Sequence, residues 1–132
     1  MEGIKVISQR HDFDCGIAAL AMLLGVPYGD VAKVVKDNIH DPRLKSRGLI
    51  LRQLEEIITL FGFKTRRVYR KAGYLEGATG ILGLNGGQCA PHGHWVVVKD
   101  GLILDPSGGE AWSLDDYVKD AKCRPATLLV LA

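Results

Sequence analysis

Four polar residues in two separate segments have the types and spacing that acyl transfer at a carbonyl group requires. Cys15 could act as a nucleophile, and His94 could be the base that takes its proton. Asp105 could hold the imidazole of His94 by its second nitrogen and so fix the tautomer. Gln9 could donate a side-chain hydrogen bond toward the same point as the backbone N–H of Cys15, and two such donors form an oxyanion hole.

Cys15 stands at the start of an apolar segment. Residues 15–24, CGIAALAMLL, are apolar on every side, which predicts a buried helix that Asp14 caps and Gly25 ends. Free backbone N–H groups and the helix dipole at such an N-terminus favour a thiolate, which is the nucleophilic form of cysteine. The alternative is an inert core cysteine, and Cys15 considered alone favours that alternative because cysteine is often buried.

His94 and Asp105 lie at matching ends of a predicted hairpin. His94 heads the apolar run HWVVV, and Asp105 follows the run at 102–104. Lys99-Asp100-Gly101 between the two runs predicts a tight turn, which would pair the strands and bring Asp105 near the level of His94. Considered singly, each residue is as well explained by a role at a strand end. Their matched positions favour the catalytic interpretation.

Other histidines and cysteines are weaker candidates. A metal site could be imagined from Cys89, His92 and His94, but no fourth ligand follows at a known spacing. We therefore expect neither a metal nor a cofactor. His92 is better explained as a solvated loop residue, and His40 as a surface residue.

The elements that must position these residues change character halfway along the chain. Helices are predicted at 15–24, 27–35, 49–61 and 113–119, strands at 4–7, 63–69, 80–84, 95–99, 102–104 and 127–131, and a loop at 36–48. Helices thus dominate the first half and antiparallel strands the second. This order predicts one α+β domain over residues 1–132, with N-terminal helices packed on a C-terminal antiparallel sheet.

Composition excludes several classes of function. The chain has 132 residues, the length of one domain, and its net charge of +2 does not call for a nucleic-acid partner. The basic cluster at 64–71 (Lys64, Arg66, Arg67, Arg70 and Lys71) is interpreted as a solvated strand face. The N-terminus lacks the pattern of a signal peptide, and the longest apolar stretch is too short to span a bilayer. Three cysteines without a zinc spacing predict reduced thiols and a cytoplasmic location.

The two segments together resemble the bacteriocin-processing, double-glycine peptidases, which are papain-like cysteine proteases often found at the N-terminus of peptide exporters. The resemblance is carried by Gln9, Asp14-Cys15-Gly16, Ala18, Leu20, Met22, Gly93-His94 with its Val-rich strand, and Asp105-Pro106. It covers almost the whole chain and implies a papain-like cysteine peptidase fold. It also implies that Cys15 attacks, His94 shuttles the proton, Asp105 orients His94 and Gln9 serves the oxyanion hole. Because the chain stops after its last strand, we expect a free-standing form.

We therefore predict a cysteine peptidase that hydrolyses a peptide or isopeptide bond through a thioester on Cys15, with His94 as general acid and base. The expected partner is a protein or peptide substrate. Two alternatives stay open: a catalytically silent peptide-binding domain of the same fold, and an amide acyltransferase of the transglutaminase type, which uses the same residue types. The sequence is silent on oligomeric state.

Overall fold

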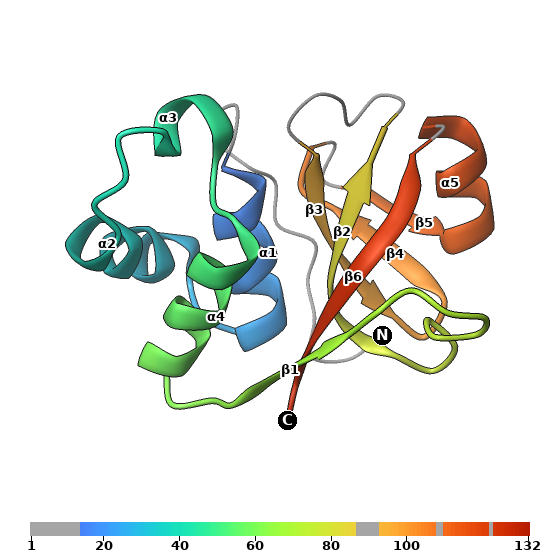
Figure 1. Cartoon of the computed structure of the whole chain (residues 1–132), viewed down its shortest axis with the longest axis horizontal. Helices are drawn as coiled ribbons and strands as arrows, with labels where there is room; N and C mark the ends of the chain where they lie inside the picture. The colour runs from blue at the N-terminus through green and yellow to red at the C-terminus, as the bar shows by residue number, and fades with distance from the viewer. Residues whose placement is uncertain (1–13, 87–92, 108–109, 122) are drawn as a thin grey trace.

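Helices and a six-stranded antiparallel sheet form two neighbouring layers (Figure 1). The structure is a computed structural model that describes residues 14–86, 93–107, 110–121 and 123–132. The helices on one side of the sheet are α1 (Cys15–Leu24), α2 (Tyr28–Asn38), α3 (Leu44–Arg47) and α4 (Leu51–Leu60), and α5 (Leu114–Ala121) lies on the opposite side (Figure 1). The predicted α+β class, with helices of the first half packed on an antiparallel sheet, is confirmed.

The sheet has the strand order β1-β6-β2-β3-β4-β5, and every neighbouring pair is antiparallel. Its strands are β1 (Thr65–Val68), β2 (Thr79–Asn85), β3 (His94–Lys99), β4 (Leu102–Asp105), β5 (Glu110–Ser113) and β6 (Arg124–Leu131). The central strands β2 and β3 are buried over most of their length, which explains their nearly continuous apolar sequences.

Two hydrophobic clusters lie on the two faces of the sheet. The first joins α1, α2 and α4 to side chains such as Val97 and Leu104. The second lies on the other face and holds Val96, Ile103 and Tyr117 of α5. Because side chains alternate along a strand, Asp105 shares the face of Ile103 and therefore that of α5.

Helix α1 has the predicted bounds. Gly25 adopts a left-handed conformation with φ +67°, and its N–H donates to the Ala21 carbonyl over 3.0 Å, so the predicted C-terminal cap is confirmed. The predicted capping of the helix N-terminus by the Asp14 side chain is wrong. The Asp14 side chain makes no capping hydrogen bond and instead accepts one from the Tyr28 hydroxyl.

The hairpin that carries His94 and Asp105 also has the predicted turn. Lys99 pairs with Leu102, and the two turn residues Asp100 and Gly101 have φ of 50° and 80°. Positive φ at both positions is what the tight hairpin turn demands, and Asp-Gly tolerates it.

The structure differs from the predicted elements at two places. Helix α2 runs to Asn38 and α3 lies at 44–47, so the predicted loop at 36–48 is partly helical because its apolar Leu44 packs on the core. Strand β5 was not predicted, since Glu110–Ser113 is short and mostly exposed. The predicted strand at 4–7 lies outside the described residues.

The cysteines and the charged surface were predicted with mixed success. Cys123 is buried and disulfide-bonded, so the expectation of reduced thiols is wrong for this residue, whereas Cys15 is free.

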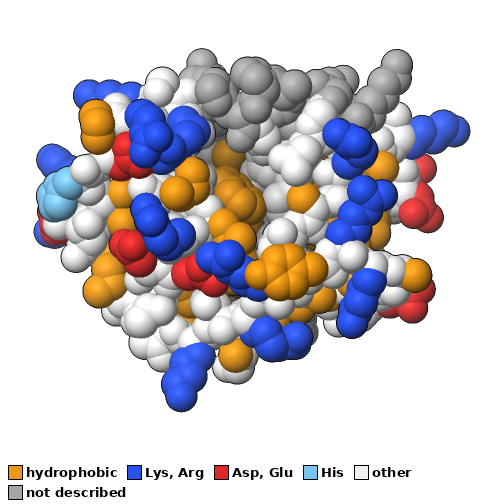
Figure 2. All heavy atoms as spheres, in the orientation of Figure 1, with side chains coloured by type: hydrophobic (Ala, Val, Ile, Leu, Met, Phe, Trp, Pro, Cys, Tyr) orange, Lys and Arg blue, Asp and Glu red, His pale blue; other side chains and the backbone are white. Residues whose placement is uncertain are grey.

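The basic cluster at 64–71 is exposed on and around β1, and Arg67 pairs with Glu55. On the face shown in Figure 2, Lys and Arg side chains are scattered over both halves of the molecule. No helix among the described residues has the length and apolarity needed to cross a membrane.

Candidate active site

Cys15 is the first residue of α1 and is 8% exposed. Its burial follows from the apolar helix that it begins, because residues on every side of α1 pack into the core. The Asp14 carbonyl accepts the first hydrogen bonds of the helix, from Ile17 and Ala18, so the backbone N–H of Cys15 is not used within the helix. A thiol in this position lies within the positive end of the helix dipole.

His94 lies between Cys15 and Asp105. Its Nε2 atom is 2.7 Å from Oδ1 of Asp105, and its side chain is also hydrogen-bonded to the thiol of Cys15. With Nε2 bound to the carboxylate, Nδ1 is the ring nitrogen left for the thiol. The structure therefore brings together the nucleophile, base and carboxylate candidates that the sequence identified.

The surroundings of His94 and Asp105 favour a charged imidazolium on His94. Burial lowers the pKa of His94, but hydrogen bonds to Asp105 and Cys15 outweigh burial and raise this pKa to about 9. Burial raises the pKa of Asp105, but hydrogen bonds from His94 and Tyr117 outweigh it and hold this pKa below its usual range. At neutral pH the site thus holds an imidazolium and a carboxylate, and the imidazolium stabilises a thiolate beside it.

Tyr117 is a further member of the site that sequence reasoning missed. Its hydroxyl donates to Oδ2 of Asp105 over 2.7 Å, while the backbone N–H of Ser107 donates to Oδ1 over 2.9 Å. The helix that carries Tyr117 was predicted, but its packing against Asp105 was not. The available signal was an aromatic residue on the apolar face of an otherwise polar helix.

Trp95 fixes the start of β3 against the helical layer. Its Nε1 donates to the Leu49 carbonyl over 2.7 Å. A Cβ atom added at Gly16 would lie 3.3 Å from the Trp95 ring and 3.2 Å from Leu49, and one added at Gly83 would lie 2.9 Å from that ring. Glycine at both positions lets α1 and β2 approach Trp95 closely. This packing sets the distance between Cys15 and the residue next to Trp95, His94.

Polar contacts brace the segment that carries Leu49. The carboxylate of Asp41 accepts hydrogen bonds from Arg43 N over 2.9 Å and from Gln53 Nε2 over 3.0 Å, and it also pairs with Arg47. Gln53 Oε1 in turn accepts from the backbone N–H of Ile50 over 2.9 Å, which begins α4. These contacts hold in place the segment whose Leu49 carbonyl accepts the hydrogen bond from Trp95 of β3.

Several candidate residues are not part of the described site. Gln9, Cys89 and His92 lie outside the described residues. His40 is exposed, as predicted. Among the described residues, no group of three or more His, Cys, Asp or Glu side chains could hold a metal ion.

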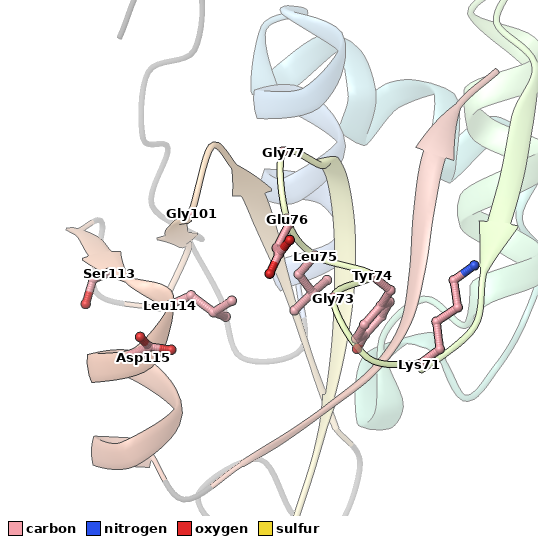
Figure 3. Close-up of a pocket in the computed structure, with 10 residues that line it drawn as sticks. All are labelled: Lys71, Gly73, Tyr74, Leu75, Glu76, Gly77, Gly101, Ser113, Leu114 and Asp115. Atoms are coloured by element: carbon pink, nitrogen blue, oxygen red, sulfur yellow. The ribbon is translucent and has the colours of Figure 1, made fainter.

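A cavity of about 470 Å³ lies at the opposite end of the hairpin (Figure 3). Gly101 of the hairpin turn, Leu114 at the start of α5, and Tyr74 contribute to its lining. Glu76 and Asp115 are its carboxylates, and neither histidine nor cysteine lines it. Cys15, His94 and Asp105 are not among its lining residues, so this cavity is distinct from the candidate site.

Comparisons with known proteins agree with the fold described above. The model of the peptidase C39 family matches residues 3–113. One similar solved structure is a double glycine motif protease from an AMS/PCAT transporter, in complex with the leader peptide. It is 20% identical with a TM-score of 0.70, covering 97% of this chain and 90% of that one. No curated protein sequence matches the chain.

A second similar structure is the peptidase domain of Streptococcus mutans ComA, solved in complex with a small-molecule inhibitor. It is 16% identical with a TM-score of 0.63, covering 97% of this chain and 98% of that one. At these identities the likeness shows the fold, which is the papain-like fold predicted from the sequence.

Proposed function

The chain belongs to the peptidase C39 family of cysteine peptidases, and we propose that Cys15, His94 and Asp105 carry out its catalysis. The observation that carries the assignment is the continuous set of contacts from the Cys15 thiol through His94 to Asp105 at the N-terminus of a buried helix. A silent binding domain would have no use for a buried imidazolium beside a free thiol.

The reaction follows from the protonation states. The Cys15 thiolate attacks the carbonyl carbon of the scissile amide, and the His94 imidazolium gives its proton to the leaving nitrogen, which departs as an amine. A thioester remains on Cys15. Neutral His94 then takes a proton from water, the resulting hydroxide attacks the thioester, and a carboxylic acid leaves as the thiolate is restored. Asp105 keeps the imidazole oriented through both steps.

Gln9 is proposed as the side-chain donor of the oxyanion hole. The support is its position six residues before Cys15 together with the unused backbone N–H at the start of α1. The two donors would stabilise the negative charge that develops on the carbonyl oxygen during attack.

The proposed substrate is a protein or peptide cut at a peptide or isopeptide bond. Support comes from the similar double glycine motif protease, which was solved in complex with a leader peptide. A peptide library incubated with the protein, followed by mass spectrometry, would show new termini if the bond is hydrolysed. Addition of a primary amine separates hydrolysis from acyl transfer, because a transferase would incorporate the amine into the product.

Selective alkylation tests the catalytic assignment without knowledge of the substrate. We expect iodoacetamide near pH 6 to modify the free thiol of Cys15 much faster than it modifies free cysteine in solution, and His94→Ala to abolish this difference. His40→Ala is the matched control, because His40 is an exposed histidine outside the site. Modification of Cys15 no faster than that of free cysteine would contradict the assignment and favour a binding domain.

We also propose that residues 1–132 form one papain-like domain located in the cytoplasm. The single sheet order that joins β1 to β5 supports one cooperative unit, which predicts a single unfolding transition in urea. The cytoplasmic location rests on the sequence, and the disulfide at Cys123 opposes it because disulfides are rare in reducing compartments. Trapping of thiols with an alkylating agent in intact cells decides the matter: three modified cysteines support the cytoplasm, and one contradicts it.

A further inference from the structure

The carboxylate of Asp105 is held at both oxygens. His94 Nε2 and Ser107 N contact Oδ1, at 2.7 Å and 2.9 Å, and the Tyr117 hydroxyl contacts Oδ2 at 2.7 Å. Asp105 is 9% exposed and Tyr117 is 6% exposed, so little water competes for these contacts. A buried carboxylate held at one oxygen could turn about its Cβ–Cγ bond, whereas contacts at both oxygens prevent this rotation.

Tyr117 is itself firmly placed by its surroundings. The Leu114 N–H donates to the Gly101 carbonyl over 2.9 Å, which ties the start of α5 to the turn of the hairpin that carries Asp105. Figure 3 shows Leu114 and Gly101 side by side at this junction. The ring of Tyr117 also packs edge-to-face on Trp112 of β5, with centroids 6.0 Å apart. The hairpin, β5 and α5 thus form one rigid support behind Asp105.

The family match ends at residue 113, one residue before α5 begins. The part of this support that α5 supplies, including Tyr117, therefore lies outside the residues that the family model covers. We propose that Tyr117 is a positioning residue for the peptidase reaction, whose hydroxyl holds the Asp105 carboxylate in the orientation that binds His94. This role rests on the proposed function of Cys15, His94 and Asp105.

The chemistry of the contact suits this role. Burial and the hydrogen bond to Asp105 both raise the pKa of Tyr117 well above its usual value, so the hydroxyl stays protonated and donates throughout the working range of pH. A neutral donor adds no charge that would compete with His94 for the carboxylate. It does, however, lower the pKa of Asp105, which keeps the carboxylate charged in mildly acidic solution.

Tyr117→Phe tests the role, since it removes the hydroxyl and leaves the ring that packs on Trp112. Without this donor Asp105 takes up a proton at higher pH, and His94 loses its charged partner there. We expect the acid limb of Cys15 alkylation by iodoacetamide to move about one pH unit higher, which is about a ten-fold lower rate on that limb. Turnover of any peptide substrate should fall through kcat with little change in KM.

Tyr74→Phe is the matched control. The Tyr74 hydroxyl also donates a 2.7 Å hydrogen bond, but to the Ala126 carbonyl away from the site, so its alkylation profile should overlay that of the wild type. Trp112→Leu is a second variant. It keeps the Tyr117 hydroxyl but removes the ring that packs on Tyr117, so the acid limb of Cys15 alkylation should move to higher pH by less than it does in Tyr117→Phe.

The outcomes separate the two proposals. Alkylation of wild-type Cys15 no faster than that of free cysteine overturns the proposed function, and the role of Tyr117 with it. Fast alkylation of Cys15 in the wild type combined with a wild-type pH profile in Tyr117→Phe overturns the role of Tyr117 alone. Equal losses of thermal stability in both Tyr→Phe variants with no change in either profile would likewise show that Tyr117 is merely structural.

Discussion

His94 Nε2 and Asp105 Oδ1 lie 2.7 Å apart across a hairpin, and the two residues are 11 positions apart in the chain. The pairing follows from the tight turn at Asp100-Gly101, because its register sets which residues of β3 and β4 lie at the same end. A turn at one end of the hairpin thus determines the contact between the proposed base and its carboxylate at the other end.

Replacement of Asp105 by asparagine separates the orienting role of this side chain from its charge. The amide oxygen can still accept the Nε2–H of His94, as in papain-like sites that use Cys-His-Asn, so we expect a loss of only about ten-fold in turnover near neutral pH. The pKa of His94 should fall from about 9, because the charged partner that raises it is gone.

The basic limb of the activity profile should consequently move to lower pH in Asp105→Asn. Asp105→Ala should lose more activity, since nothing then orients the ring. NMR titration of the His94 ring protons measures the shift directly. An unchanged His94 titration in Asp105→Asn would contradict the contact.

Protein stability should depend on the charge of His94. The folded pKa of about 9 lies above the usual histidine pKa of 6.5, so the stabilisation is fully present below pH 6.5 and is lost as pH rises through 9. This difference corresponds to ~3 kcal/mol in the free energy of unfolding. The contribution of Asp105 to the free energy of unfolding has the opposite pH dependence. Because its pKa is lowered in the folded protein, ionised Asp105 stabilises the fold above the usual carboxyl range of pH, and this stabilisation is lost on acidification.

Urea unfolding at pH 6 and pH 9.5 measures the His94 contribution. The wild type and His40→Ala should lose stability between these two values, and His94→Ala should lose less. A loss of the same size in His94→Ala would assign the pH dependence to other groups.

The sequence predicted the site better than it predicted the site's support. Cys15, His94 and Asp105 were found because local signals carry them: an apolar helix after Asp-Cys-Gly, and an Asp-Gly turn between two apolar runs. The sequence did not predict the contact of Tyr117 with Asp105 or the hydrogen bonds around Asp41. These contacts join residues 12 positions apart, and they depend on how the elements pack. The short strand β5 escaped for the same reason, since its pairing with β4 rather than its own composition makes it a strand.

Gly16→Ala tests whether close packing around Trp95 controls the site. The new Cβ would lie 3.2–3.3 Å from Leu49 and Trp95, so the neighbours must shift. We expect a loss of about 1–3 kcal/mol in stability and slower alkylation of Cys15, because Trp95 adjoins His94. Gly29→Ala in α2 is the control, since nothing lies within 4 Å of its added Cβ. That variant should gain about 0.5–1 kcal/mol from helix propensity and leave alkylation unchanged.

Gln9→Ala separates stabilisation of the oxyanion from activation of the nucleophile. Iodoacetamide reacts with the thiolate by displacement at carbon and forms no tetrahedral oxyanion, so its rate at Cys15 reports only the Cys15–His94–Asp105 contacts. Peptide hydrolysis needs both these contacts and the oxyanion donors. We therefore expect Gln9→Ala to lower kcat about 10²–10³-fold while alkylation of Cys15 keeps its wild-type rate and pH profile. A parallel loss in both reactions would instead place Gln9 among the residues that hold the thiolate, and undiminished hydrolysis would remove it from the site.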